Sequence, residues 1–136
     1  MTRVLVTGAN GLLGGHLVRE LLAQGHQVNA LVRPTSDTQT LAGLDVERFY
    51  GDVRDRASFR KAADGCEVIY HCAAVFSYWG YSLEEMQSTA RQGSEVLVDV
   101  AQDAGVKRIV LTSSTAVLGG QQKPALLAEQ ARLSTT

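Results

Sequence analysis

The stretch VLVTGANGLLGGHL, residues 4–17, decides how this chain folds. An apolar run comes first, and Gly8, Gly11 and Gly14 follow at a spacing of three, just before a helical stripe of leucines. In a parallel α/β sheet such a strand–turn–helix binds a dinucleotide. The first glycine permits the tight turn, the second lets a pyrophosphate approach, and the third lets the helix pack closely. The simpler alternative is that these glycines only turn the chain.

Outward from this motif, short apolar runs alternate with stretches of helical periodicity. Strands are predicted at residues 4–6, 28–32, 46–50, 68–71 and 108–112. A long helix is predicted from the apolar face formed by Met86, Ala90, Gly93, Leu97, Val100 and Ala104. Asp55 has the place of a helix cap. Five strands joined by helix-length crossovers predict an α/β fold: a Rossmann-type, doubly wound parallel sheet in the order 3-2-1-4-5, truncated after strand five.

Composition and charge narrow the class of protein. The chain has 136 residues, 45% of them hydrophobic, and a net charge of −1, so neither nucleic acid nor a membrane surface is an expected partner. We expect residues 1–118 to form an NAD(P)-binding domain and 119–136 a weakly helical or disordered tail. Cys66 and Cys72 lack a metal-type spacing with histidine, so we expect free structural thiols and no metal site. No signal peptide is recognisable, which favours a cytoplasmic location.

The identity of the dinucleotide depends on the end of the second predicted strand. NAD-binding proteins usually place an Asp or Glu there, about 20 residues past the glycines, to hold the ribose hydroxyls. Arg33 stands at that place here, 19 residues after Gly14, and a guanidinium can bind a 2′-phosphate in a bidentate manner. The sequence therefore predicts NADP rather than NAD. The alternative is that Arg33 is only a solvated charge at a strand end.

Several separate motifs resemble one known family. They are TGANGLLG at the glycine turn, GDVRD at 51–55, HCAAV at 71–75 and VKRIVLTSSTAVLG at 106–119. Together they resemble the N-terminal portion of the extended short-chain dehydrogenase/reductase family, the NAD-dependent epimerase/dehydratase group. The likeness is greatest to its dihydroflavonol-reductase-like branch.

The resemblance implies roles for individual residues. Asp52, with the Val53 backbone beside it, would contact adenine, and the small residues at 72–74 would lie against the cofactor ribose. Turn formation by Asp52 and ordinary sheet packing at 72–74 are the alternatives. Ser114 would be the catalytic serine that binds the substrate oxygen, although a hydroxyl cluster at a strand end can also be a turn. The expected cofactor-binding residues are Thr7, Gly8, Gly11, Leu12, Leu13, Gly14, Arg33, Asp52, Val53, Cys72, Ala73, Ala74 and Thr112.

The family's Tyr-x-x-x-Lys pair, which supplies the general acid/base and the lysine that lowers its pKa, does not occur in this sequence. None of the four tyrosines has a lysine four residues later. Ala90 stands where the family usually has an asparagine that supports the proton relay. We therefore expect the cofactor-binding portion of a longer enzyme, without its C-terminal substrate domain.

Three functions remain open from sequence. The first is the NADP(H)-binding portion of an oxidoreductase or epimerase that transfers hydride at a carbonyl or alcohol carbon. The others are a non-catalytic NADP(H)-sensing module and a sugar-nucleotide epimerase or dehydratase that retains NAD. The aromatic stretch FSYWGY at 76–81 either lines a pocket for an apolar or aromatic small-molecule substrate or covers the core. A homodimer is a further expectation for a full-length protein.

Overall fold

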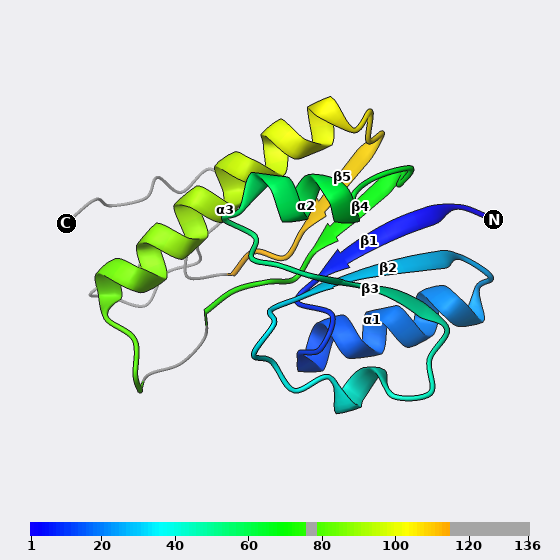
Figure 1. The fold of residues 1–136 in the computed structure, drawn as a ribbon, viewed down its shortest axis with the longest axis horizontal. Helices are drawn as coiled ribbons and strands as arrows, with labels where there is room; N and C mark the ends of the chain where they lie inside the picture. The colour runs from blue at the N-terminus through cyan, green and yellow to red at the C-terminus, as the bar shows by residue number, and fades with distance from the viewer. Residues whose placement is uncertain (76–78, 115–136) are drawn as a thin grey trace, which may run out of the picture.

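The computed structural model, which describes residues 1–75 and 79–114, contains one five-stranded parallel sheet with helices on both faces (Figure 1). The strand order is β3-β2-β1-β4-β5, so the predicted fold class and order are confirmed. The elements are β1 (Arg3–Thr7), α1 (Leu12–Ala23), β2 (Gln27–Val32), the 3-10 helix η1 (Gln39–Leu41), β3 (Val46–Tyr50), α2 (Arg56–Ala62), β4 (Val68–His71), α3 (Leu83–Asp103) and β5 (Arg108–Leu111). The predicted tail at 119–136 lies outside the described residues.

Alternation along the strands divides the core into two layers. Val4 and Val6 of β1 pack in the cluster with Val18 and Leu21 of α1, whereas Leu5 packs with Phe59 of α2 and Leu97 of α3. Figure 1 shows α1 on one face of the sheet and α2 and α3 on the other. Ile69 of β4 joins Leu5 on that second face, and both are fully buried. The inner strands β1 and β2 are buried along nearly their whole length, so their apolar runs are almost continuous, which is typical of parallel sheets. The edge strands β3 and β5 are largely exposed.

Side chains close to the helix starts in sequence cap α2 and α3. The Asp55 carboxylate accepts hydrogen bonds from the backbone N–H groups of Ala57 and Ser58 and caps α2, as predicted. Ser82 and Glu85 form a reciprocal capping box at the start of α3. Within α3, a Cβ on Gly93 would lie 3.2 Å from the Val53 side chain, so a glycine lets this helix approach the loop after β3.

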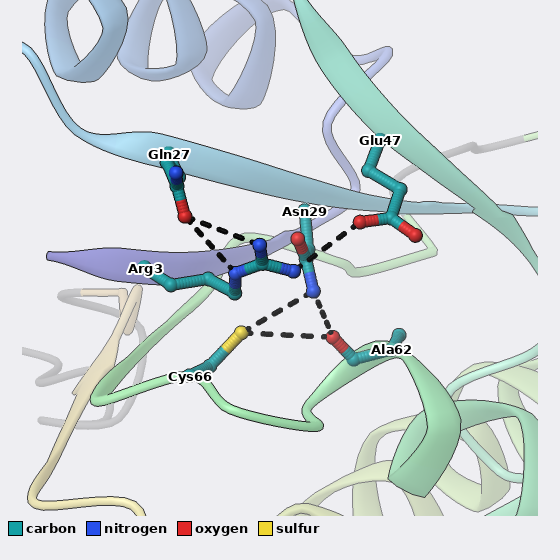
Figure 2. A network of polar contacts seen from close by, with 6 residues as sticks. All are labelled: Arg3, Gln27, Asn29, Glu47, Ala62 and Cys66. Carbon is teal, nitrogen blue, oxygen red and sulfur yellow. Dashed lines mark hydrogen bonds and ion pairs between the residues drawn. The ribbon is translucent and has the colours of Figure 1, made fainter.

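Two groups of polar contacts lie near the amino-terminal ends of β1, β2 and β3, one around Arg3 and one around Asn29 (Figure 2). Arg3 donates to Gln27 and forms an ion pair with Glu47 at 3.3 Å. Buried Asn29 donates to the Ala62 carbonyl at 2.7 Å and to Cys66 Sγ at 3.4 Å. Burial also raises the pKa of the Cys66 thiol to about 11. Cys66 is therefore a structural thiol, as the sequence predicts.

Candidate functional site

A cavity of about 250 Å³ opens at the carboxyl ends of the strands, the edge where open α/β sheets bind ligands. It brings together predicted residues from four segments that follow β1, β2, β3 and β4. These residues are Gly8, Arg33, Asp52, Val53, Cys72, Ala73 and Ala74. Thr7, Gly11, Leu12, Leu13, Gly14, Thr112 and Ser114 do not line it.

The three glycines of the turn meet different structural demands. Gly8 has a φ of +65°, and a Cβ there would lie 2.9 Å from the Ala73 backbone. A Cβ on Gly14 would lie only 2.2 Å from the Gly8 carbonyl oxygen, so α1 could not start where it does. Gly11 has an ordinary φ of −77°, and its nearest obstacle is the Gly8 oxygen at 3.3 Å. The fold therefore demands glycine at positions 8 and 14 much more strongly than at position 11.

The amino terminus of α1 is left without a side-chain cap. Its N-cap is Gly11, which has no side chain to accept from the first-turn N–H groups, and no acidic residue lies in that turn. Leu12 and Leu13 are 84% and 53% exposed there. Uncapped N–H groups and the positive end of the helix dipole together favour an anion at this point.

Thr7 is fully buried, and its side chain forms hydrogen bonds within the protein. Its hydroxyl accepts a hydrogen bond from the Ala73 N–H at 3.2 Å and shares another with His71 Nδ1 at 3.0 Å. His71 also stacks on Phe59, with ring centroids 6.2 Å apart. This network ties the end of β1 to the segment after β4, which forms one wall of the cavity.

Burial lowers the pKa of His71 from its ordinary value of 6.5, and this predicts a pH effect on stability. As the pH falls below 6.5, the unfolded chain binds a proton at His71 while the folded chain does not. The free energy of unfolding should therefore decrease there, with a slope of up to about 1.4 kcal/mol per pH unit that ends at the folded-state pKa. Urea unfolding of His71→Gln between pH 5 and 7 should show this slope removed. His16→Gln, at an exposed position of α1, should keep it, and an unchanged slope in His71→Gln would contradict the assignment.

Asp52 and Arg54, two charged residues of the cavity, form an ion pair, whereas within residues 1–75 and 79–114 Arg33 does not. The Asp52 carboxylate accepts from Arg54 Nε at 2.9 Å, from Nη2 at 2.8 Å and from its backbone N–H. These bonds from Arg54 hold the pKa of Asp52 below its ordinary value, and the positive charge of Arg33 adds to the effect. Arg33 forms no ion pair within the described residues and donates from Nη1 to the Tyr81 hydroxyl at 3.5 Å.

Sequence reasoning missed part of the lining. The additional cavity residues are Leu31, Gly51, Arg54, Val75, Tyr81, Glu85 and Thr89. Tyr81 belongs to the aromatic stretch at 76–81, which the sequence predicts either to line a substrate pocket or to cover the core. Residues 76–78 of that stretch lie outside the described residues, and Trp79 is 87% exposed. Nothing local marks Thr89, because only the packing of α3 brings it to the strand ends.

The comparisons with known proteins agree with this geometry. Residues 4–135 match the profile of the NAD dependent epimerase/dehydratase family. The chain belongs to this family. Family membership confirms the resemblance inferred from the four motifs and supports a nucleotide-binding module of the oxidoreductase or epimerase kind.

Relatives within the epimerase/dehydratase family differ in their reactions. Sterol demethylase protein B of Methylococcus capsulatus is 48% identical over 115 residues, which cover 85% of this chain and 35% of that protein. A proposed dihydroflavonol 4-reductase of Synechocystis sp. is 39% identical over 114 residues, covering 84% of this chain and 33% of the relative. This chain thus spans about a third of the length of these relatives.

A solved structure shows the same fold with its nucleotide in place. It is a UDP-glucose-4-epimerase from Stenotrophomonas maltophila with bound NAD and formylated UDP-arabinopyranose. It superposes with a TM-score of 0.83 at 30% identity, over 100% of this chain and 44% of that chain. The structural neighbours of this family member therefore include proteins with bound NAD.

The segment after β5 holds the two remaining predicted residues. The Thr112 hydroxyl donates to Cys72 Sγ at 3.6 Å, and its N–H donates to the His71 carbonyl, so it lies against the segment that follows β4. Ser114 is exposed two residues further along. Both cysteines are free thiols, as predicted; Cys66 is buried, whereas Cys72 is half-buried and lines the cavity.

Two further properties concern metals and membranes. Within residues 1–75 and 79–114, no group of three His, Cys, Asp or Glu side chains is arranged to hold a metal ion. Over the same part of the chain, every helix is too short or too polar to cross a membrane.

Proposed function

We propose that this chain is the NADP(H)-binding portion of an oxidoreductase or epimerase that transfers hydride at a carbonyl or alcohol carbon. The observation that carries the choice of NADP is Arg33. It stands at the cavity directly after β2, without an ionic partner among the described residues, where a binder of NAD usually has a carboxylate. A guanidinium with free donors suits a 2′-phosphate, which a carboxylate would repel.

The other residues of the site fit the remaining parts of a dinucleotide. The uncapped start of α1 would hold the pyrophosphate, and the bare backbone of Gly11 would let it approach. Asp52 would accept from the adenine amino group, since Oδ2 accepts only one bond from Arg54. The small residues Cys72, Ala73 and Ala74 would leave room for the nicotinamide-side ribose. When bound, the nicotinamide supplies or accepts the hydride.

Catalysis would need groups beyond those identified in this chain. We assign the substrate-binding serine role to Ser114, on the family motif. The absent Tyr-x-x-x-Lys pair makes the chain catalytically incomplete by itself, because a positioned general acid/base contributes about 10²–10⁴-fold in rate. We place the complete enzyme in the cytoplasm, acting as a homodimer on an apolar or aromatic small molecule.

One alternative function has specific support. Bound NAD in the Stenotrophomonas epimerase favours an NAD-retaining epimerase or dehydratase. An NADP(H)-sensing module without catalysis is the other alternative that the sequence leaves open. Residual hydride transfer by this chain would exclude the sensing role.

Calorimetric titration of the 136-residue chain with NADPH and with NADH tests the proposed cofactor. We expect NADPH to bind at least about tenfold more tightly, because at least one charge-assisted contact to the 2′-phosphate distinguishes the two ligands. Equal affinities, or tighter binding of NADH, would contradict the proposal and favour the NAD-retaining alternative.

Thiol labelling tests where the dinucleotide binds. At pH 8, iodoacetamide should modify Cys72, which lines the cavity, while buried Cys66 reacts only after unfolding. NADPH at ten times its Kd should slow the modification of Cys72 about tenfold, because protection follows the fraction of empty sites. Cys72→Ser identifies the labelled residue by removing the native-state signal. An unchanged rate with saturating NADPH would place the ligand elsewhere.

A further inference from the structure

Tyr81 and Arg33 meet at the cavity from segments far apart in the chain. Arg33 directly follows β2, and Tyr81 immediately precedes Ser82, the N-cap of α3, so 48 residues separate them. The Tyr81 hydroxyl accepts from Arg33 Nη1 at 3.5 Å, and both residues line the cavity. The contact therefore connects the end of β2 to the start of α3 beside the candidate nucleotide site.

The backbone that carries Tyr81 is fixed by the start of α3. The Glu85 N–H donates to the Ser82 hydroxyl at 3.1 Å, and the Ser82 N–H donates to the Glu85 carboxylate at 2.7 Å. Tyr81 is joined directly to this closed capping box, and its side chain is 43% exposed. Tyr81 thus directly precedes an ordered helix start, and its hydroxyl reaches Arg33 from outside the core.

The charges around Arg33 show why a neutral partner matters. The other charged residues of the cavity are Asp52, Arg54 and Glu85. Asp52 is paired with Arg54, and Glu85 is engaged by Ser82. The Tyr81 hydroxyl is neutral, so its contact with Arg33 leaves the positive charge of the guanidinium available to a phosphate. Holding a flexible arginine in place before binding also reduces the side-chain entropy lost on binding.

We infer that Tyr81 is a positioning residue that holds Arg33 for the 2′-phosphate and thereby strengthens the preference for NADP(H) over NAD(H). The inference rests on the proposed function, since it requires Arg33 to bind that phosphate. It adds a specificity determinant from the start of α3, an element that the proposed function does not otherwise use for binding the dinucleotide.

A double-mutant cycle in which the affinities for NADPH and NADH are both measured tests this role. The full chain, Tyr81→Phe, Arg33→Ala and the double variant are titrated with NADPH and NADH at one ionic strength. Tyr81→Phe should weaken NADPH binding about three- to tenfold, as expected for one hydrogen bond to a charged group at a partly exposed site, and leave NADH unchanged. In the Arg33→Ala background, Tyr81→Phe should have no further effect. Tyr50→Phe, at an exposed tyrosine that does not line the cavity, should bind both ligands as the unaltered chain does.

The outcomes separate the inference from the proposed function. Equal weakening of NADPH and NADH by Tyr81→Phe would show a general structural role and overturn the inference alone. The same conclusion would follow if Arg33→Ala weakened NADPH binding but Tyr81→Phe did not. An unchanged NADPH affinity in Arg33→Ala would overturn both the proposed function and the inference.

Discussion

Gly14→Ala is expected to lower the free energy of unfolding by about 3 kcal/mol, whereas Gly11→Ala should lower it by less than about 1 kcal/mol. At position 14 the new methyl group would lie 2.2 Å from the Gly8 oxygen, which is rigid backbone and can yield only if α1 moves. At position 11 the corresponding distance is 3.3 Å and the backbone has an ordinary φ of −77°. Urea unfolding of the two variants measures the difference.

The two glycine variants also distinguish an effect on folding from an effect on nucleotide binding. Gly11→Ala should keep the fold yet weaken both NADPH and NADH about tenfold or more, because the methyl group would stand where the pyrophosphate approaches the helix N-terminus. Gly25→Ala is a useful contrast: Gly25 has a φ of +80° but open space around it and does not line the cavity, so it should lose stability without losing ligand affinity. Normal nucleotide affinity in a folded Gly11→Ala chain would contradict the placement of the pyrophosphate.

Arg33→Ala is expected to weaken NADPH binding about 10- to 100-fold and to change NADH binding less than about twofold. Loss of a charge-assisted, bidentate contact to phosphate has this magnitude. The selectivity follows from the ligands, since only NADPH carries the 2′-phosphate. Calorimetry or fluorescence titration at two salt concentrations provides the measurement, and the preference of the unaltered chain for NADPH should decrease as salt screens the contact.

Two variants control for simpler explanations. Arg91→Ala removes the same charge from an exposed position of α3 outside the cavity and should leave both affinities unchanged. Arg33→Lys retains the charge without the planar pair of donors and should give an intermediate NADPH affinity. An equal loss in Arg91→Ala would mean that overall charge, rather than a local contact, governs NADPH binding.

The fold could be predicted from sequence because its signals are local and periodic. Apolar runs of strand length, separated by helix-length crossovers, leave few arrangements for a parallel sheet, and the order β3-β2-β1-β4-β5 is the one expected of a doubly wound fold. Position along the chain also placed Arg33 at the end of β2 and Asp55 at the start of α2. Glycine spacing identified the turn, but could not show that Gly8 and Gly14 meet stricter packing demands than Gly11.

By itself, then, the sequence determined the parallel sheet, the glycine turn and the strand ends at which a dinucleotide would bind. Only the tertiary structure decided the partners of the side chains there. The buried Thr7 hydroxyl forms hydrogen bonds with the Ala73 N–H and with His71, and Arg33 donates to the Tyr81 hydroxyl. Periodicity reports which face of an element is apolar and where the element ends. It does not report which distant segments meet at the edge of the sheet, because that depends on how strands and helices from separate parts of the chain pack together.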